Sequence, residues 1–211
     1  MTMKYFISLL LLFLLIGCGP ELDDSAEYAD TNLADLCSNQ FDVSETERPA
    51  TFEPKGHYAI MRGLIGSSTP DRVADLLDEN PDVEILVIAY SPGSEDDEAN
   101  LEAALMLHEA QIDTCVPPGG EINSGGVDLF LAGDDRWLAD DSWVGVHSWG
   151  ADGYAGSDLD NDDPEHQSYL DYYRKIGIDE AFYWYTLDAA GADDIHNMSS
   201  AEREQYGVAT E

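Results

Sequence analysis

Positively charged residues are scarce in this chain. Only 9 of the 211 residues are Lys or Arg, against 44 Asp or Glu, and the formal net charge is −35. So few cations cannot form a basic face, and a polyanion would be repelled, so nucleic-acid binding is excluded. Dissolved salt screens the mutual repulsion of carboxylates. We therefore expect a saline habitat and a lower stability in dilute buffer.

Cysteine is also rare, and no pattern of metal ligands is present. The three cysteines are Cys18, Cys37 and Cys115. Their spacing fits no metal site, and the histidines form no HExxH-like pair. The acidic run at 158–163 alternates like the start of a calcium loop, but Asp163 stands where such a loop requires glycine. A solvated acidic loop is favoured, and the sequence predicts no metal and no cofactor.

The amino terminus has the zones of a secretory signal. Lys4 precedes an apolar run from Tyr5 to Ile16, which is too short to span a bilayer stably. The tetrad Leu15-Ile16-Gly17-Cys18 resembles the lipobox of bacterial lipoproteins. That resemblance implies cleavage before Cys18 and lipidation of its sulfur, so that the protein is tethered to a membrane without spanning it. We expect a location in the bacterial cell envelope, facing the periplasm or the exterior. A plain signal peptide is the alternative.

The remaining chain divides into a linker and a folded part. We interpret residues 1–17 as the signal peptide, 18–55 as an acidic flexible stalk and 56–211 as one folded domain. Leu33–Cys37 could form one helical turn inside the stalk. In an oxidising compartment Cys37 and Cys115 are permitted to form a disulfide, and two buried free thiols are the alternative.

Strand and helix patterns alternate along the folded part, which has enough apolar residues for a core. The predicted strands are Tyr58–Ile65, Glu84–Tyr90, Thr114–Val116 and Trp143–His147. Helical patterns begin at Thr69 and cover Asn100–Gln111, Pro164–Ala190 and Ser199–Tyr206. Such alternation predicts an α/β fold of right-handed βα units with a mostly parallel sheet.

Four short motifs follow one another in a recognisable order. They are Ser91-Pro92-Gly93, then Ser124-Gly125-Gly126 with Leu129–Gly133, then Val144–His147, and finally Met198–Glu202 with Tyr206–Val208. Over about Ile60 to Val208, this order and spacing resemble the Clp protease and crotonase-like superfamily, with the Clp proteolytic subunit and its secreted relatives as the nearest branch. The resemblance implies repeated ββα units with a mostly parallel sheet.

The resemblance also implies a set of catalytic residues. Ser124 would be the nucleophile and His147 the base that takes its proton. The backbone N–H groups of Gly93, Ser94 and Gly125 would form the oxyanion hole. Asp194 is the favoured third member of the triad, because it precedes the last motif.

Several alternatives stay open at this site. Asp193 is a close second to Asp194, and both acids could instead cap the following helix. Lys175 could in principle replace His147 in a serine–lysine dyad. Ser94 stands where the family has a second glycine, and Asn123 is larger than the usual residue, so both could obstruct the groove.

We therefore expect an envelope-anchored serine hydrolase, most simply a peptidase with a Ser-His-Asp arrangement acting on a peptide or protein substrate. An inactive binding or scaffold lipoprotein is the alternative, and an acyl-CoA enzyme is a weaker third, because CoA phosphates would find few cations here. Related folds usually assemble into rings or trimers, so a homo-oligomer is possible. An aromatic helical band would form core or a subunit contact; it comprises Tyr169, Tyr172, Tyr173, Tyr183, Trp184 and Tyr185.

Overall fold

The computed structural model describes residues 32–151 and 153–210. The signal peptide, the lipidation site at Cys18 and the first part of the stalk lie outside the described residues. Within the described ranges no helix is long and apolar enough to cross a bilayer.

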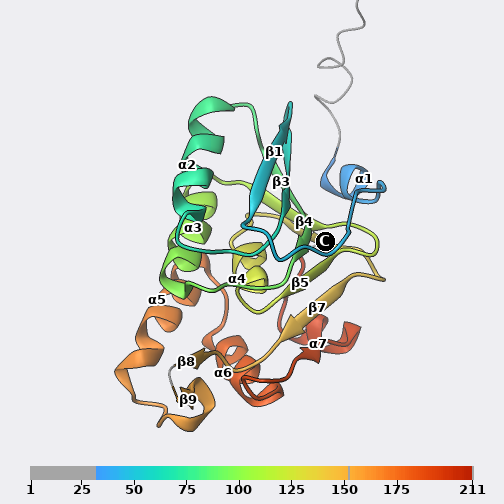
Figure 1. Cartoon of the computed structure of the whole chain (residues 1–211). Coiled ribbons are helices and arrows are strands. Elements are labelled where there is room, and N and C mark those ends of the chain that lie inside the picture. The colour runs from blue at the N-terminus through green and yellow to red at the C-terminus, as the bar shows by residue number, and fades with distance from the viewer. Residues whose placement is uncertain (1–31, 152, 211) are drawn as a thin grey trace, which may run out of the picture.

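The strands form one large sheet and one small hairpin (Figure 1). The strands of the large sheet are β1 (Thr51–Lys55), β2 (Tyr58–Arg62), β3 (Ile85–Ser91), β4 (Asp113–Val116), β5 (Glu121–Asn123), β6 (Arg136–Leu138), β7 (Trp143–Val146) and β10 (His196–Asn197). The hairpin pairs β8 (Gly150–Ala151) with β9 (Tyr154–Ala155). The sequence did not predict six of these strands, which are β1, β5, β6, β8, β9 and β10.

The large sheet is mostly parallel. Its order is β1-β2-β3-β5-β7-β10, and β4 pairs with both β3 and β6. Only the outer pairs β1–β2 and β7–β10 are antiparallel. The first half of β3 pairs with β4, whereas its last residues, Tyr90 and Ser91, pair with β5. Every residue of β3 is buried, as its apolar sequence predicts. The predicted α/β fold with a mostly parallel sheet is confirmed.

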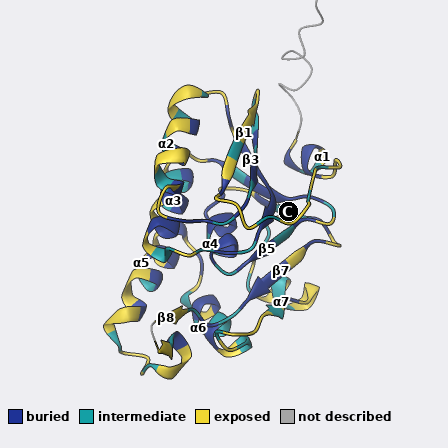
Figure 2. Ribbon diagram, viewed as in Figure 1, coloured by how far each residue is buried: buried dark blue, intermediate teal, exposed yellow. Residues whose placement is uncertain are grey.

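Helices cover one face of this sheet and extend beyond its end. They are α2 (Thr69–Glu79), α3 (Asp97–Glu109), α4 (Gly125–Leu131), α5 (Gln167–Ile176), α6 (Glu180–Ala189) and α7 (Ser200–Gln205), with short 3₁₀ turns at Gly156–Asp158 and Pro164–His166. Helix α3 contacts α2, α4 and α5. Helix α4 lies in the interior and is almost wholly buried, whereas α2 and α5 each keep an exposed side (Figure 2).

The opposite face of the sheet is covered by the amino-terminal segment. Helix α1 (Leu33–Cys37) packs its apolar side against Ile85 and Val87 of β3. A disulfide joins Cys37 to Cys115 of β4, with the Cα atoms 6.1 Å apart. Of the two states that the sequence allowed for these cysteines, the structure contains the disulfide, and the helical turn at Leu33–Cys37 is confirmed.

The stalk prediction is wrong for residues 32–55. Besides α1, this segment contributes β1, which pairs along its whole length with β2. Arg62 also binds the segment, through Asp42 at 2.6 Å and the Ser44 carbonyl at 2.5 Å. The segment's own polarity is typical of a linker, but the disulfide and backbone pairing hold it on the domain. The folded domain therefore begins before residue 56.

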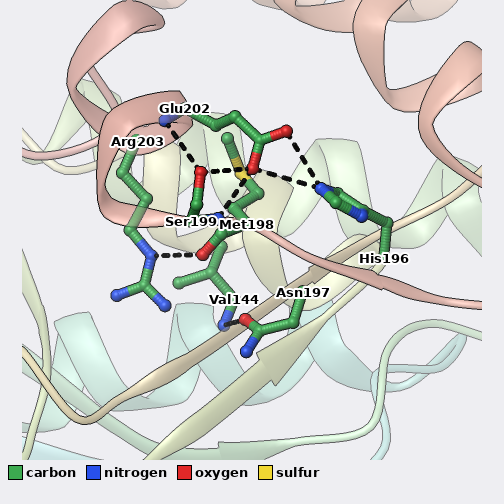
Figure 3. Close-up of polar contacts among 7 residues, drawn as sticks. All are labelled: Val144, His196, Asn197, Met198, Ser199, Glu202 and Arg203. Atoms are coloured by element: carbon green, nitrogen blue, oxygen red, sulfur yellow. Dashed lines mark hydrogen bonds and ion pairs between the residues drawn. The ribbon is translucent and has the colours of Figure 1, made fainter.

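The last motif closes the sheet edge next to β7 (Figure 3). Ser199 caps α7 in a reciprocal capping box with Glu202, and His196 lies 3.1 Å from the same carboxylate. Hydrogen bonds from Ser199 lower the pKa of Glu202 to about 2. The Val144 N–H donates to the side chain of Asn197 at 3.2 Å. These contacts fix the carboxyl-terminal segment against β7, the strand that leads to His147.

Candidate active site

Three neighbouring parallel strands end at one edge of the sheet. Asn123 of β5 lies opposite Gly145 of β7, so the residues that follow these strands, Ser124 and His147, emerge side by side. The Ser124 N–H donates to the Gly145 carbonyl at 2.8 Å. On the other side β5 pairs with the end of β3, which leads to Gly93. In α/β sheets this carboxyl edge is where ligands bind.

Ser124 has a strained backbone. Its φ is 50° and its ψ is −126°, and among the described residues only Gln111 and Ser124 are non-glycine residues with a positive φ. Such a conformation costs about 1–3 kcal/mol and persists only where the surrounding structure imposes it. Ser124 is also the residue immediately before α4. This sharp strand-to-helix turn is the kind that exposes a nucleophilic hydroxyl.

Close packing under this turn explains the glycines around Ser124. A Cβ atom at Gly93, whose φ is 127°, would lie 3.1 Å from the Cβ of Ser124. A Cβ at Gly125 would collide with Ser94 and would lie 2.8 Å from Nδ2 of Asn100. Any side chain at these two positions would push the turn away from the end of β3.

The two residues expected to obstruct the groove are turned elsewhere. The Ser94 hydroxyl donates to the Asp97 carboxylate. The Asn123 amide donates to Glu121 at 2.6 Å. Neither side chain lines the pocket that contains Ser124. The expected obstruction is therefore not present.

Backbone donors are available beside Ser124. The N–H groups of Gly93 and Ser94 donate to no acceptor among residues 32–151 and 153–210. Gly125 is the first residue of α4, and the first N–H groups of a helix have no partner inside it. These are the three residues that the sequence predicts for an oxyanion hole, and the packing of Gly93 and Gly125 brings them next to the Ser124 turn.

His147 lines the same pocket as Ser124. Burial lowers the pKa of His147, while backbone groups of Ser148 and Ala192 and the charge of Asp97 act in the opposite direction. The imidazole is therefore neutral at pH 7, which is the form that accepts a proton. No hydrogen bond joins the Ser124 hydroxyl to His147, and within the described part of the chain the buried Nδ1 of His147 has no partner.

The acids expected to orient His147 lie elsewhere. Asp193 and Asp194 are both exposed, and the Asp194 carboxylate accepts the N–H of Ile195 at 2.9 Å. The structure does not bring either acid to the imidazole, because residues 191–195 form a surface turn before β10. Lys175 is also remote from the pocket, and its ammonium group pairs with Glu109 at 2.5 Å.

Two other carboxylates, which the sequence analysis did not single out, line the pocket with Ser124 and His147. They are Asp97, in the first turn of α3, and Asp128, in α4. Tyr169 donates to Asp97 at 2.5 Å, and Tyr173 donates to Asp128. Burial and the charge of Asp97 raise the pKa of Asp128 to about 7. One available signal was that Asp128 interrupts the otherwise apolar run 127–132.

Aromatic side chains complete the pocket walls. Tyr169, Tyr173 and Tyr183 of the predicted aromatic band are buried, so this part of the band is core rather than an exposed subunit contact. They line the pocket together with Trp149 and Phe182. Across the described residues, no group of three or more His, Cys, Asp and Glu side chains is arranged to hold a metal ion.

The architecture and the site edge together define a class of fold. The mostly parallel sheet with a buried helix that starts at its carboxyl edge is a fold of the crotonase-like and Clp-protease-like kind. No family model and no curated protein matches the sequence. Solved structures do match.

An enoyl-CoA hydratase/isomerase family protein from Silicibacter pomeroyi aligns with a TM-score of 0.50 and 12% identity over 77% of this chain and 75% of its own. A mutant of the 1510-N membrane-bound stomatin-specific protease with a substrate peptide aligns with a TM-score of 0.48 and 18% identity over 72% and 71% of the two chains. At 12% identity, the likeness to the Silicibacter pomeroyi protein describes the fold alone.

Proposed function

We propose that this protein is a lipid-anchored serine hydrolase of the bacterial envelope and that it cleaves peptides or proteins by acyl transfer through Ser124. One observation carries the proposal. A serine held in a strained turn at the start of a buried helix faces the same pocket as a histidine whose burial keeps it neutral. Strain of this kind persists where the structure enforces it, and it is concentrated at functional sites.

The geometry supports a two-step reaction. The Ser124 hydroxyl attacks the substrate carbonyl and gives its proton to the His147 imidazole. The N–H groups of Gly93, Ser94 and Gly125 stabilise the oxyanion, each donor contributing about 3 kcal/mol. His147 then protonates the leaving amine, and water hydrolyses the acyl-enzyme. The missing Ser124–His147 hydrogen bond is compatible with this scheme, because such bonds often tighten only when substrate binds.

Asp97 replaces the expected aspartate in this scheme. It makes no hydrogen bond to His147, but its charge acts to raise the pKa of the imidazole. A nearby carboxylate therefore stabilises the imidazolium that forms when Ser124 is deprotonated. This effect is one of charge, and it does not fix the orientation of the ring.

The fold alone does not choose the reaction, because one fold hosts many chemistries. By its name, the Silicibacter pomeroyi protein belongs to a family of CoA enzymes. The present chain has only 9 Lys and Arg residues with which to bind CoA phosphates. The charge of the chain therefore favours hydrolysis over CoA chemistry.

A fluorophosphonate probe tests the hydrolase proposal. We expect the probe to label Ser124 in the folded wild-type protein and to leave Ser124→Ala unlabelled. In His147→Ala the rate of labelling should fall by roughly 100-fold or more. Ser168→Ala is the matched control, because Ser168 is exposed on α5 and lies outside the pocket. A folded wild-type protein that does not react would favour a second candidate, an inactive binding protein. The absence of a Ser124–His147 hydrogen bond in the described structure is the observation that favours that candidate.

The lipid anchor is a separate part of the proposal. It depends on the resemblance of Leu15–Cys18 to a lipobox. We expect the expressed wild-type protein to incorporate labelled fatty acid and to sediment with membranes, and Cys18→Ala to do neither. A wild-type protein that is secreted without acylation would contradict the anchor and leave the hydrolase proposal intact.

A further inference from the structure

We propose that the pocket beside Ser124 selects a substrate residue with a positively charged side chain, lysine or arginine, and that Asp97 and Asp128 determine this specificity. The inference rests on the proposed hydrolase function, since it assigns the substrate class of the same site. It comes from three features of the pocket: where its carboxylates lie, which partners they have, and what forms its walls.

Both carboxylates lie next to the reacting groups. Asp128 follows Gly125 by three residues in α4, so the two share one side of the helix. Asp97 comes from the first turn of α3, the helix that packs against α4. Both line the pocket together with Ser124 and His147. A side chain that enters this pocket from a bound substrate therefore meets two acids from two different helices.

Neither carboxylate has a cationic partner in the described structure. Asp97 accepts hydrogen bonds from the hydroxyls of Ser94 and Tyr169, and Asp128 accepts one from Tyr173. All three donors are neutral. Burial raises the pKa values of both tyrosines, which keeps them protonated as donors.

Three cations of α5 and β6 are engaged elsewhere. Lys175 pairs with Glu109, and Arg174 pairs with Asp171 and Glu180. Buried Arg136 donates to the backbone carbonyls of residues 133, 207 and 208. The negative charge of the pocket is thus uncompensated. Burial, and to a smaller extent the charge of Asp97, raises the pKa of Asp128 to about 7, and no cation among the described residues offsets this.

The pocket walls suit an organic cation better than a metal ion. Trp149 stacks on Tyr169 with ring centroids 6.0 Å apart and an interplanar angle of 9°. Aromatic rings attract lysine and arginine head groups and pack against their aliphatic stems. Rings cannot coordinate a metal, and no metal-ligand group of three or more side chains occurs among the residues described. Two acids within an aromatic lining therefore match a long side chain with a charged tip.

A matched pair of substrates tests the inference. N-acetyl-lysine and N-acetyl-norleucine thiobenzyl esters have side chains of similar length and differ in the terminal charge. We expect the wild-type kcat/KM to favour the lysine ester by about tenfold or more, which is the order expected for a charge paired in a desolvated site. Asp97→Asn and Asp128→Asn should each lower the lysine-to-norleucine ratio several-fold. The ratio also cancels any change that either variant causes in the His147 base.

A control separates the pocket from the general acidity of the protein. Glu98→Gln removes one charge from an exposed residue of α3 that lies outside the pocket. We expect Glu98→Gln to keep the wild-type lysine-to-norleucine ratio, because a surface charge outside the pocket does not contact the substrate side chain. A ratio that falls as much in Glu98→Gln as in Asp97→Asn would overturn the assignment.

The two proposals fail in distinguishable ways. If the fluorophosphonate labels Ser124 but the wild-type protein hydrolyses the norleucine ester as well as or better than the lysine ester, the specificity is wrong and the hydrolase stands. If Ser124 is not labelled, NMR titration of the wild-type protein with N-acetyl-lysine methylamide and its norleucine analogue tests whether the pocket binds a cationic side chain. Binding of the lysine compound alone, lost in Asp97→Asn, would support the cation pocket. Equal binding or no binding would overturn it.

Discussion

The two ends of strand β3 are in contrasting surroundings. At its start, Ile85 and Val87 pack against α1, and the Cys37–Cys115 disulfide fastens that helix to the sheet. At its other end the chain turns through Gly93 beside Ser124, whose backbone is strained. Near this turn, the buried side-chain atoms without hydrogen-bond partners in the described structure include Ser91 Oγ, Asn100 Oδ1, Asn123 Oδ1 and His147 Nδ1.

This difference shows which end of β3 stabilises the fold and which end lowers the free energy of unfolding. The α1 end is apolar and cross-linked, and a disulfide acts mainly by restricting the unfolded chain. The Ser124 end leaves polar groups unsatisfied, and each such group costs about 1–3 kcal/mol. A strained and incompletely bonded site is expected where a substrate supplies the missing contacts. The two ends should therefore respond differently to mutation.

Removing the disulfide should have the largest effect on stability. The Cys37→Ser/Cys115→Ser double variant opens a cross-link between residues 78 apart in sequence. Chain-entropy reasoning for a loop of this length predicts a loss of about 4 kcal/mol in the free energy of unfolding. Denaturant unfolding measures it. The folded variant should keep the wild-type rate of Ser124 labelling, and a slower rate would show that the two ends are coupled.

The charge of Asp128 should make stability depend on pH. The pKa of Asp128 is about 7 in the folded state, against an ordinary value of 3.8 for this side chain. The folded protein therefore binds the proton more tightly, so this group lowers the free energy of unfolding as pH rises from about 4 to 7. Asp128→Asn lacks this pH-dependent contribution, and it should gain roughly 3–4 kcal/mol over the wild type between pH 4 and pH 8. Denaturant unfolding at both pH values gives the difference, and a constant difference would contradict the shift.

Relief of the strain at Ser124 should have a smaller effect. Glycine adopts a positive φ without steric cost, so Ser124→Gly should raise the free energy of unfolding by about 1 kcal/mol. Ser124→Ala is the matched control, because it removes the hydroxyl but keeps the Cβ atom. Thermal or denaturant unfolding of both variants measures the effect. If both are equally stable, the strain inferred from φ is not stored at this residue.

Added salt should raise the stability of the whole protein, with no preference for either end of β3, so its effect is the least specific of the four. The net charge of −35 repels itself, and raising salt from about 0.1 M to 1 M shortens the screening length from ~10 Å to ~3 Å. We expect the midpoint of thermal unfolding to rise over this range. An unchanged midpoint would count against adaptation to saline surroundings.

Periodicity was enough to predict the central elements of the fold. The apolar run at 84–90 predicted β3, and Thr69 followed by Pro70 marked the start of α2. Strands β5 and β6 were missed because they are three residues long and carry Glu121 and Arg136, so no pattern could develop. The docking of residues 32–55 was missed because it depends on a disulfide that the sequence only permitted and on the pairing of β1 with β2, neither of which the polar composition of the segment reveals.

The candidate site was predictable only in part. Motif order placed Ser124 and His147 at matching positions, and the structure brings them to one pocket. Asp97 and Asp128 come together through the packing of α3 against α4, which no local pattern encodes. Position along the chain suggested Asp194, but the surface turn at 191–195 directs it to the N–H of Ile195.

The rate of fluorophosphonate labelling at Ser124, measured from about pH 5 to pH 8, tests the central claim most directly. Burial lowers the pKa of His147 from its ordinary value of 6.5, so the imidazole gains its proton only in more acidic solution. The account predicts a labelling rate that rises with pH through a midpoint below 6.5 and that is lost to a large extent in His147→Ala. A folded protein that is not labelled at Ser124, or one labelled at a rate indifferent to His147, would contradict it.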